Sequence, residues 1–138
     1  MSPVLLDTGP LVALVVGTDA LHGWAIEQLK LIEPPLLTCD AVIAEACFLL
    51  KQEKHDPTDV IRLARAGLFE AKFDFGRESA ALLELMTRYR DQPMSFADAC
   101  LVRLAELHHQ SSVWTMNRDF KIYRRNRRSS IPLISPFD

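Results

Sequence analysis

The stretch Val4-Leu5-Leu6-Asp7-Thr8-Gly9-Pro10, near the start of the chain, gives the clearest indication of the fold. Three apolar residues followed closely by Gly and Pro predict a short buried strand that ends in a turn and leads into a helix. Asp7 would then lie at the carboxyl end of that strand, the edge at which open α/β sheets build their binding sites. This acid is therefore the first candidate functional residue.

Three further acids occupy comparable places along the chain. Glu45 lies within an apolar helical pattern, Asp98 falls in the first turn of another helix, and Asp119 follows a second buried strand. Carboxylates a few ångströms apart do not stay ionised without a compensating cation. If the four acids converge, the sequence therefore predicts a site for a divalent metal ion.

The spacing of the apolar segments predicts the fold class. Strands separated by helices of ten or more residues imply parallel pairing through right-handed crossovers. The result is a three-layer α/β/α sandwich with a mostly parallel sheet of about five strands. The expected strands are 3–7, 36–38, 68–75, 113–116 and 131–134, and the expected helices are 10–16, 20–33, 41–53, 58–67, 77–90, 96–109 and 118–123.

Composition is that of an ordinary soluble globular protein. The chain has 138 residues, 49% of them hydrophobic and 25% charged, and we expect residues 1–138 to form one domain with one core. A net charge of −2 leaves only a local patch for binding nucleic acid. No signal peptide or membrane span is indicated, which favours the cytoplasm. Three scattered cysteines are predicted to be reduced thiols used as small core residues: Cys39, Cys47 and Cys100.

Each acid also has a structural interpretation, and the sequence leaves these alternatives open. Asp7 is a favoured residue for capping the helix that follows it. The segment Ser95-Phe96-Ala97-Asp98 resembles a capping box. Asn117 can cap a short helix in which Asp119 is favoured by the helix dipole. Glu45, whose neighbours one helical turn away are apolar, would be costly in the core but could instead lie partly exposed on a helix flank.

Four segments, taken in order, are similar to the motifs of the PIN-domain nucleases. They are Val4-Leu5-Leu6-Asp7-Thr8-Gly9-Pro10, Val42-Ile43-Ala44-Glu45, Ser95-Phe96-Ala97-Asp98-Ala99 and Thr115-Met116-Asn117-Arg118-Asp119-Phe120. The resemblance spans nearly the whole chain and is strongest to the small prokaryotic members, many of which are toxins of VapBC-type toxin–antitoxin pairs. It implies a five-stranded parallel sheet, a Mg²⁺ or Mn²⁺ cofactor, hydrolysis of RNA phosphodiester bonds, a small antitoxin partner and a homodimer.

Carried over by position, the resemblance assigns Thr8 to the hydroxyl residue that often follows the first Asp, and the acidic site to Asp7, Glu45, Asp98 and Asp119. Asn117 departs from the pattern, since many relatives carry another acid there. An amide adds no charge, so a PIN fold that binds RNA or protein without turnover is the alternative function.

The preferences of hard cations suggest a role for each acid. Mg²⁺ takes oxygen ligands, keeps several waters and is usually held by one or two protein carboxylates. We expect Asp7 and Asp98 to be direct ligands, with Asp119 binding directly or through water. Glu45 would then orient or deprotonate the attacking water.

The segment from 118 to 128 carries six basic residues against one acid. Such a cluster can neutralise phosphates and bind RNA through its backbone, and Tyr123 within it could stack a base. The alternative is a solvated, mobile basic loop. The candidate RNA-binding residues are Arg118, Lys121, Arg124, Arg125, Arg127 and Arg128.

Two helices, at 20–33 and 41–53, could form an apolar groove for an amphipathic antitoxin helix. For most of the residues concerned, the favoured interpretation is that they belong to the core. The residues concerned are Trp24, Leu29, Ile32, Phe48 and Leu50.

Overall fold

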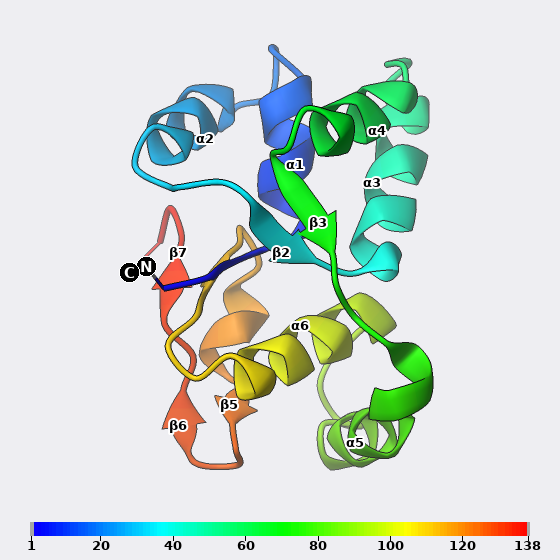
Figure 1. The fold of residues 1–138 in the computed structure, drawn as a ribbon, viewed down its shortest axis with the longest axis vertical. Coiled ribbons are helices and arrows are strands. Elements are labelled where there is room, and N and C mark those ends of the chain that lie inside the picture. The colour runs from blue at the N-terminus through cyan, green and yellow to red at the C-terminus, as the bar shows by residue number, and fades with distance from the viewer. Residues whose placement is uncertain (1, 138) are drawn as a thin grey trace.

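The computed structural model describes residues 2–137, which place helices on both faces of one central sheet (Figure 1). Five strands pair in the order β3-β2-β1-β4-β7, and every pairing is parallel. This is the α/β/α sandwich that the sequence predicts. The strands of the sheet are β1 (Val4–Leu6), β2 (Leu36–Thr38), β3 (Phe69–Ala71), β4 (Ser112–Trp114) and β7 (Leu133–Ile134).

Figure 1 shows α1 to α4 gathered on one side of the sheet and α5 and α6 on the other. α6 is the most deeply buried helix, because it packs directly against β1 and β4 while α5 covers its outer side. The helices are α1 (Thr8–Val15), α2 (His22–Leu29), α3 (Asp40–Gln52), α4 (Thr58–Arg65), α5 (Phe75–Arg88) and α6 (Phe96–Leu107), followed by the short 3₁₀ helix η1 (Arg118–Lys121).

The strands at the centre of the sheet are buried on both faces, as expected where helices cover each side. Leu5 and Leu6 of β1 and Val113 and Trp114 of β4 are completely buried. β1 lies between β2 and β4, so the chain leaves it to build one half of the sheet and returns beside it to build the other. This reversal makes the carboxyl ends of β1 and β4 neighbours, which is the position where open α/β sheets bind ligands.

One predicted strand is wrong in its second half. The alternation of apolar residues suggested a strand over 68–75, but β3 ends at Ala71 and α5 begins at Phe75. The side chain of Asp74 accepts a hydrogen bond from the backbone N–H of Arg77 at 3.3 Å and caps the new helix. This local cap overrides the period-two pattern, and Phe75 is left 57% exposed.

The basic segment near the carboxyl terminus is not a mobile loop without structure. Its chain pairs with itself as an antiparallel hairpin of β5 (Arg124–Arg125) and β6 (Ser129–Ser130), separate from the main sheet. Asn126 and Arg127, in the connecting turn, have left-handed backbone conformations with φ of 51° and 70°. The alternative of a loop without regular structure is therefore wrong for this part of the segment, although residues 126–130 are exposed to solvent.

Two smaller expectations concern membranes and thiols. No helix within residues 2–137 combines the length and apolar composition that crossing a bilayer requires. The cysteines are free thiols, and two of them fill core positions as predicted: Cys39 and Cys100 are buried, whereas Cys47 is half-buried.

Candidate metal centre at the carboxyl edge of the sheet

Asp7 connects the sheet to the start of α1. Its backbone N–H donates to the carbonyl oxygen of Trp114 at 3.0 Å, which continues the pairing of β1 with β4. One carboxylate oxygen, Oδ1, accepts from the backbone N–H of Thr8 at 2.8 Å, and the other, Oδ2, accepts from the hydroxyl of Thr115 at 2.6 Å. Asp7 is thus a helix cap, and at the same time a carboxylate that is only 6% exposed at the edge of the sheet.

Burial makes the ionised form of Asp7 unfavourable. Desolvation raises the pKa of this carboxyl group to about 6, and the charges of Asp98 and Glu45 push it in the same direction. The hydrogen bonds from Thr115 and Thr8 oppose the shift without cancelling it. A bound cation would stabilise the charged form of this carboxyl group and so offset the cost of burial, as happens in a metal site.

Asp98 is held at the start of α6 by a capping box. The hydroxyl of Ser95 accepts from the backbone N–H of Asp98 at 3.0 Å, and Oδ2 of Asp98 accepts from the backbone N–H of Ser95 at 3.4 Å. The same Oδ2 accepts from the hydroxyl of Tyr123 at 2.9 Å. Asp98 is 6% exposed, and burial, with a smaller contribution from Asp119, raises its pKa. The capping interpretation is therefore correct, and it fixes the carboxylate in place.

Glu45 stands at the mouth of the cavity that these two aspartates line. It is exposed on α3, so the alternative of a Glu on a helix flank holds, yet its side chain shares one space with both aspartates. The cavity has a volume of about 240 Å³. It is lined by Asp7, Thr8, Gly9, Glu45, Leu49, Asp98, Met116 and Asn117.

Asp119 is the one predicted acid that does not line this cavity. It is half-buried in the first turn of η1, where its backbone N–H donates to the side-chain oxygen of Asn117 at 2.9 Å. Asn117 therefore caps η1, as the structural interpretation of the sequence suggested. Asp119 still lies near enough to Asp98 for its charge to raise that pKa, and its role as a ligand stays a prediction.

The residues present fit a hard divalent cation held partly through water. The side chains available are oxygen donors, and Thr8 adds a buried hydroxyl that has no hydrogen-bond partner among the described residues. No three His, Cys, Asp or Glu side chains within residues 2–137 are gathered closely enough to hold an ion alone. Mg²⁺ typically keeps several waters and uses one or two carboxylates, so Asp7 and Asp98 are sufficient anchors.

As the pH rises from about 4 to about 6, the metal-free protein is expected to lose stability because Asp7 ionises. Its folded pKa of about 6 lies above the ordinary 3.8, so the folded state holds the extra proton in this window and gives it up as the pH rises. The free energy of unfolding should therefore fall as the pH rises, by up to about 1.4 kcal/mol per pH unit. Urea unfolding with a chelator at pH 4, 5, 6 and 7 measures this. The fall in the free energy of unfolding with pH should be shallower in Asp7→Asn than in the parent. An equal fall in the two proteins would show that Asp7 is not its cause.

Several residues of the predicted RNA-binding cluster make contacts within the protein, and their binding to RNA stays a prediction. The guanidinium of Arg124 donates to backbone carbonyls of residues 121–123, and that of Arg125 donates to the carbonyl of His109. Arg127 pairs with Glu84 of α5. Arg118 and Lys121 lie over the ring of Phe137, at 4.8 Å and 5.3 Å.

Burial decides two other interpretations of the sequence. Tyr123 is completely buried, so the prediction that it could stack an RNA base is wrong. Ile32 and Leu50 belong to the core, as favoured for most residues of the possible groove, and Trp24 packs edge-to-face on Trp114 with ring centroids 6.4 Å apart. Phe48, in contrast, is 61% exposed on α3.

The roles of two residues at the site were not predicted from the sequence, although Thr115 lies in a PIN-like segment and Tyr123 in the basic cluster. Thr115 lies 108 positions after Asp7 and Tyr123 lies 25 positions after Asp98, and neither pairing leaves a local signal.

Comparison with known proteins agrees with this geometry. The sequence matches the PIN domain family over residues 4–126. Among solved structures, the chain is similar to VapC20 of Mycobacterium tuberculosis, described as a sarcin–ricin loop cleaving toxin, with 19% identity and a TM-score of 0.78 over 86% of this chain and 93% of that one. No curated protein sequence matches it. The likeness to VapC20 is one of fold, whereas the family match covers most of the chain. The chain therefore belongs to the PIN-domain family.

Proposed function

We propose that this protein is a divalent-metal-dependent endoribonuclease that hydrolyses RNA phosphodiester bonds. The observation that carries the proposal is the convergence of Asp7, Glu45 and Asp98 on one cavity at the carboxyl edge of the sheet. Two of these carboxylates are almost fully buried, and burial raises the pKa of both. Membership of the PIN-domain family supports the same chemistry.

Asp7 and Asp98 would hold the cation, Mg²⁺ or Mn²⁺, and Glu45 would act on the attacking water. When bound, such a cation neutralises charge on the phosphoryl oxygens and lowers the pKa of water. Asp7 and Asp98 are positioned for this role because the ends of β1 and α6 fix their backbones. Glu45, exposed and without a hydrogen-bond partner among the described residues, is free to orient a water and to take its proton.

The fold likeness to VapC20 supports a more specific assignment as the toxin of a toxin–antitoxin pair. On this proposal the substrate is RNA, the partner is a small antitoxin protein, and the protein works in the cytoplasm as a homodimer. VapC20 is described as cleaving the sarcin–ricin loop, so a structured RNA hairpin is the first substrate to test.

A non-catalytic PIN module that binds RNA or protein is the second candidate. It is favoured by Asn117, whose amide oxygen caps η1 and adds no charge to the site, and by the position of Asp119 outside the cavity. A cleavage assay separates the two candidates, because only the nuclease turns RNA over.

The purified protein is expected to unfold at a higher temperature when Mn²⁺ or Mg²⁺ is added. A ligand that binds only the folded state at a hundred times its Kd stabilises it by about 2.7 kcal/mol. In the double variant Asp7→Asn, Asp98→Asn the increase should vanish, together with metal-dependent cleavage of a hairpin RNA.

Asp74→Asn is the matched control for this test, because Asp74 also caps a helix but is exposed on α5. It should keep the full metal effect. A melting temperature that metal raises equally in the double variant would remove both aspartates from the site. Metal binding without cleavage would favour the non-catalytic module.

A further inference from the structure

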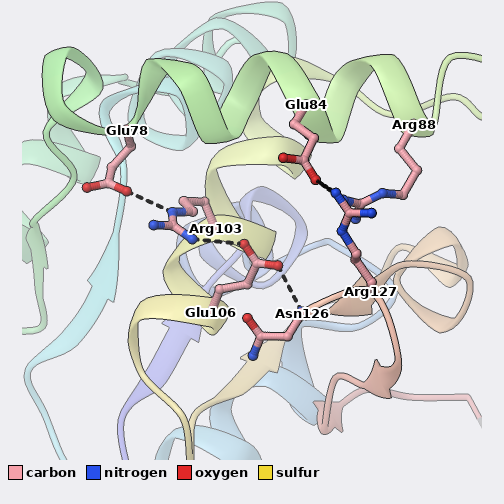
Figure 2. Close-up of polar contacts among 7 residues, drawn as sticks. All are labelled: Glu78, Glu84, Arg88, Arg103, Glu106, Asn126 and Arg127. Atoms are coloured by element: carbon pink, nitrogen blue, oxygen red, sulfur yellow. Dashed lines mark hydrogen bonds and ion pairs between the residues drawn. The ribbon is translucent and has the colours of Figure 1, made fainter.

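The β5–β6 hairpin is fastened to α5 and α6 by a network of charged side chains (Figure 2). Figure 2 shows Glu84 and Arg88 on α5 reaching toward Arg127, while Glu106 on α6 reaches toward Asn126. A cavity of about 320 Å³ lies among these groups. The three glutamates of the figure balance its three arginines, so the network offers no net charge to an anionic or cationic ligand. Its contacts instead join the hairpin to the two helices.

The strongest part of this network lies on α6. Arg103 donates to Glu78 at 2.7 Å and to Glu106 at 3.1 Å, and the second oxygen of Glu106 accepts from the backbone N–H of Asn126 at 2.8 Å. The Glu106 side chain is 9% exposed, so its bond with Arg103 is partly shielded from water, whereas its bond with Asn126 is more exposed. The pair between Arg127 and Glu84 is more exposed and contributes less.

These contacts act on a strained turn. Asn126 and Arg127 both have positive φ, a conformation that raises the energy of residues other than glycine. Glu106 accepts a hydrogen bond from the backbone N–H of Asn126, and Glu84 accepts one from the side chain of Arg127. At the start of the hairpin, the backbone N–H of Arg124 donates to the hydroxyl of Tyr89 at 2.9 Å. The hairpin is therefore fixed at its first strand and at its turn.

Tyr123 directly precedes the hairpin and links this part of the structure to the acidic site. It is completely buried between the rings of Tyr89 and Phe120, at centroid distances of 5.3 Å and 5.2 Å. Its hydroxyl donates to Oδ2 of Asp98 at 2.9 Å, and the backbone N–H of Ser95 donates to the same oxygen at 3.4 Å. Within residues 2–137, Oδ1 of Asp98 has no hydrogen-bond donor.

We propose that Tyr123 is a positioning residue for Asp98: its hydroxyl, held in place by the packing of its buried ring against Tyr89 and Phe120, occupies Oδ2 so that Oδ1 is the oxygen available to a divalent cation. This inference rests on the proposed function. It also gives the basic segment a structural role, because Arg124 and Arg127 make contacts that hold the hairpin.

The test is Mn²⁺ affinity in the absence of RNA, measured from the paramagnetic resonance signal of free Mn²⁺ during titration. Tyr123→Phe keeps the buried ring and removes the bond to Asp98, and we expect its Kd for Mn²⁺ to rise at least about tenfold, as is typical when a ligand loses its hydrogen-bond partner. Cleavage by this variant should return to within about threefold of the parent rate at saturating Mn²⁺, because only the positioning of a ligand is impaired.

Tyr89→Phe is the matched control. It removes a half-buried tyrosine hydroxyl that touches the same hairpin but not Asp98, and its Kd for Mn²⁺ should stay within about twofold of the parent. Equal Mn²⁺ affinity in Tyr123→Phe and the parent would overturn the inference alone. Equal weakening in both variants would also overturn it, because loosening of the hairpin would then explain the loss. A parent protein that binds no Mn²⁺ would overturn the proposed function and this inference with it.

Discussion

Asp7→Asn is expected to reduce RNA cleavage at least about a thousandfold in kcat/KM, equivalent to about 4 kcal/mol of transition-state stabilisation. The side chain keeps its size, but the site loses one of its two buried charges, and with it the attraction that holds a divalent cation. The same change should stabilise the metal-free protein at pH 7, because it removes a carboxylate whose ionisation is opposed by burial and by Asp98 and Glu45.

The size of the stabilisation follows from two opposing effects. The raised pKa of Asp7, about 6 against 3.8, corresponds to roughly 3 kcal/mol of unfavourable ionisation. Asparagine supplies only one acceptor for the two donors from Thr8 and Thr115, which costs about 1–2 kcal/mol. The net gain is about 1–2 kcal/mol, or roughly 4–8 °C in melting temperature.

Thermal unfolding with a chelator and single-turnover cleavage with Mn²⁺ measure the two effects separately. Asp74→Asn serves again as the control, since it alters an exposed cap and should change neither quantity appreciably. A clear loss of metal-free stability in Asp7→Asn would show that capping α1 is the main role of Asp7. Retained cleavage would exclude it from the catalytic site.

Glu45→Gln is expected to lower the cleavage rate at saturating RNA by about a hundredfold or more while leaving RNA affinity within about threefold. The glutamine can still accept a hydrogen bond from water but cannot take its proton. Glu45 is exposed, so the substitution should change the free energy of unfolding by less than about 0.5 kcal/mol.

The matched control is Glu53→Gln, which removes an exposed carboxylate at the far end of α3 and should behave like the parent. Fluorescence titration with RNA in Ca²⁺, followed by single-turnover cleavage in Mn²⁺, separates binding from chemistry. Parental cleavage by Glu45→Gln would mean that another group activates the water. A large loss of RNA affinity would instead indicate a role for Glu45 in holding substrate.

The local sequence specified the strands, helices and caps, because interactions between residues close in sequence control them. The apolar run before Asp7 became β1, and Ser95 with Asp98 formed the predicted capping box. Alternation failed only where a cap competed with it: Asp74 started α5 within the expected strand over 68–75. Parallel pairing of β1 to β4 could also be anticipated, since helices separate these four strands and leave no hairpin connection between them.

Only the tertiary structure decided how the candidate residues relate to one another. The bonds from Thr115 to Asp7 and from Tyr123 to Asp98 join residues distant in sequence. The first forms because β4 pairs beside β1, and the second because the segment before β5 packs against α6. Packing likewise determined that Tyr123 is buried, that Glu45 is exposed and that Asp119 stands outside the cavity. Periodicity and motif spacing report which face of its own element a side chain occupies, whereas burial and long-range hydrogen bonds depend on which other elements cover that face.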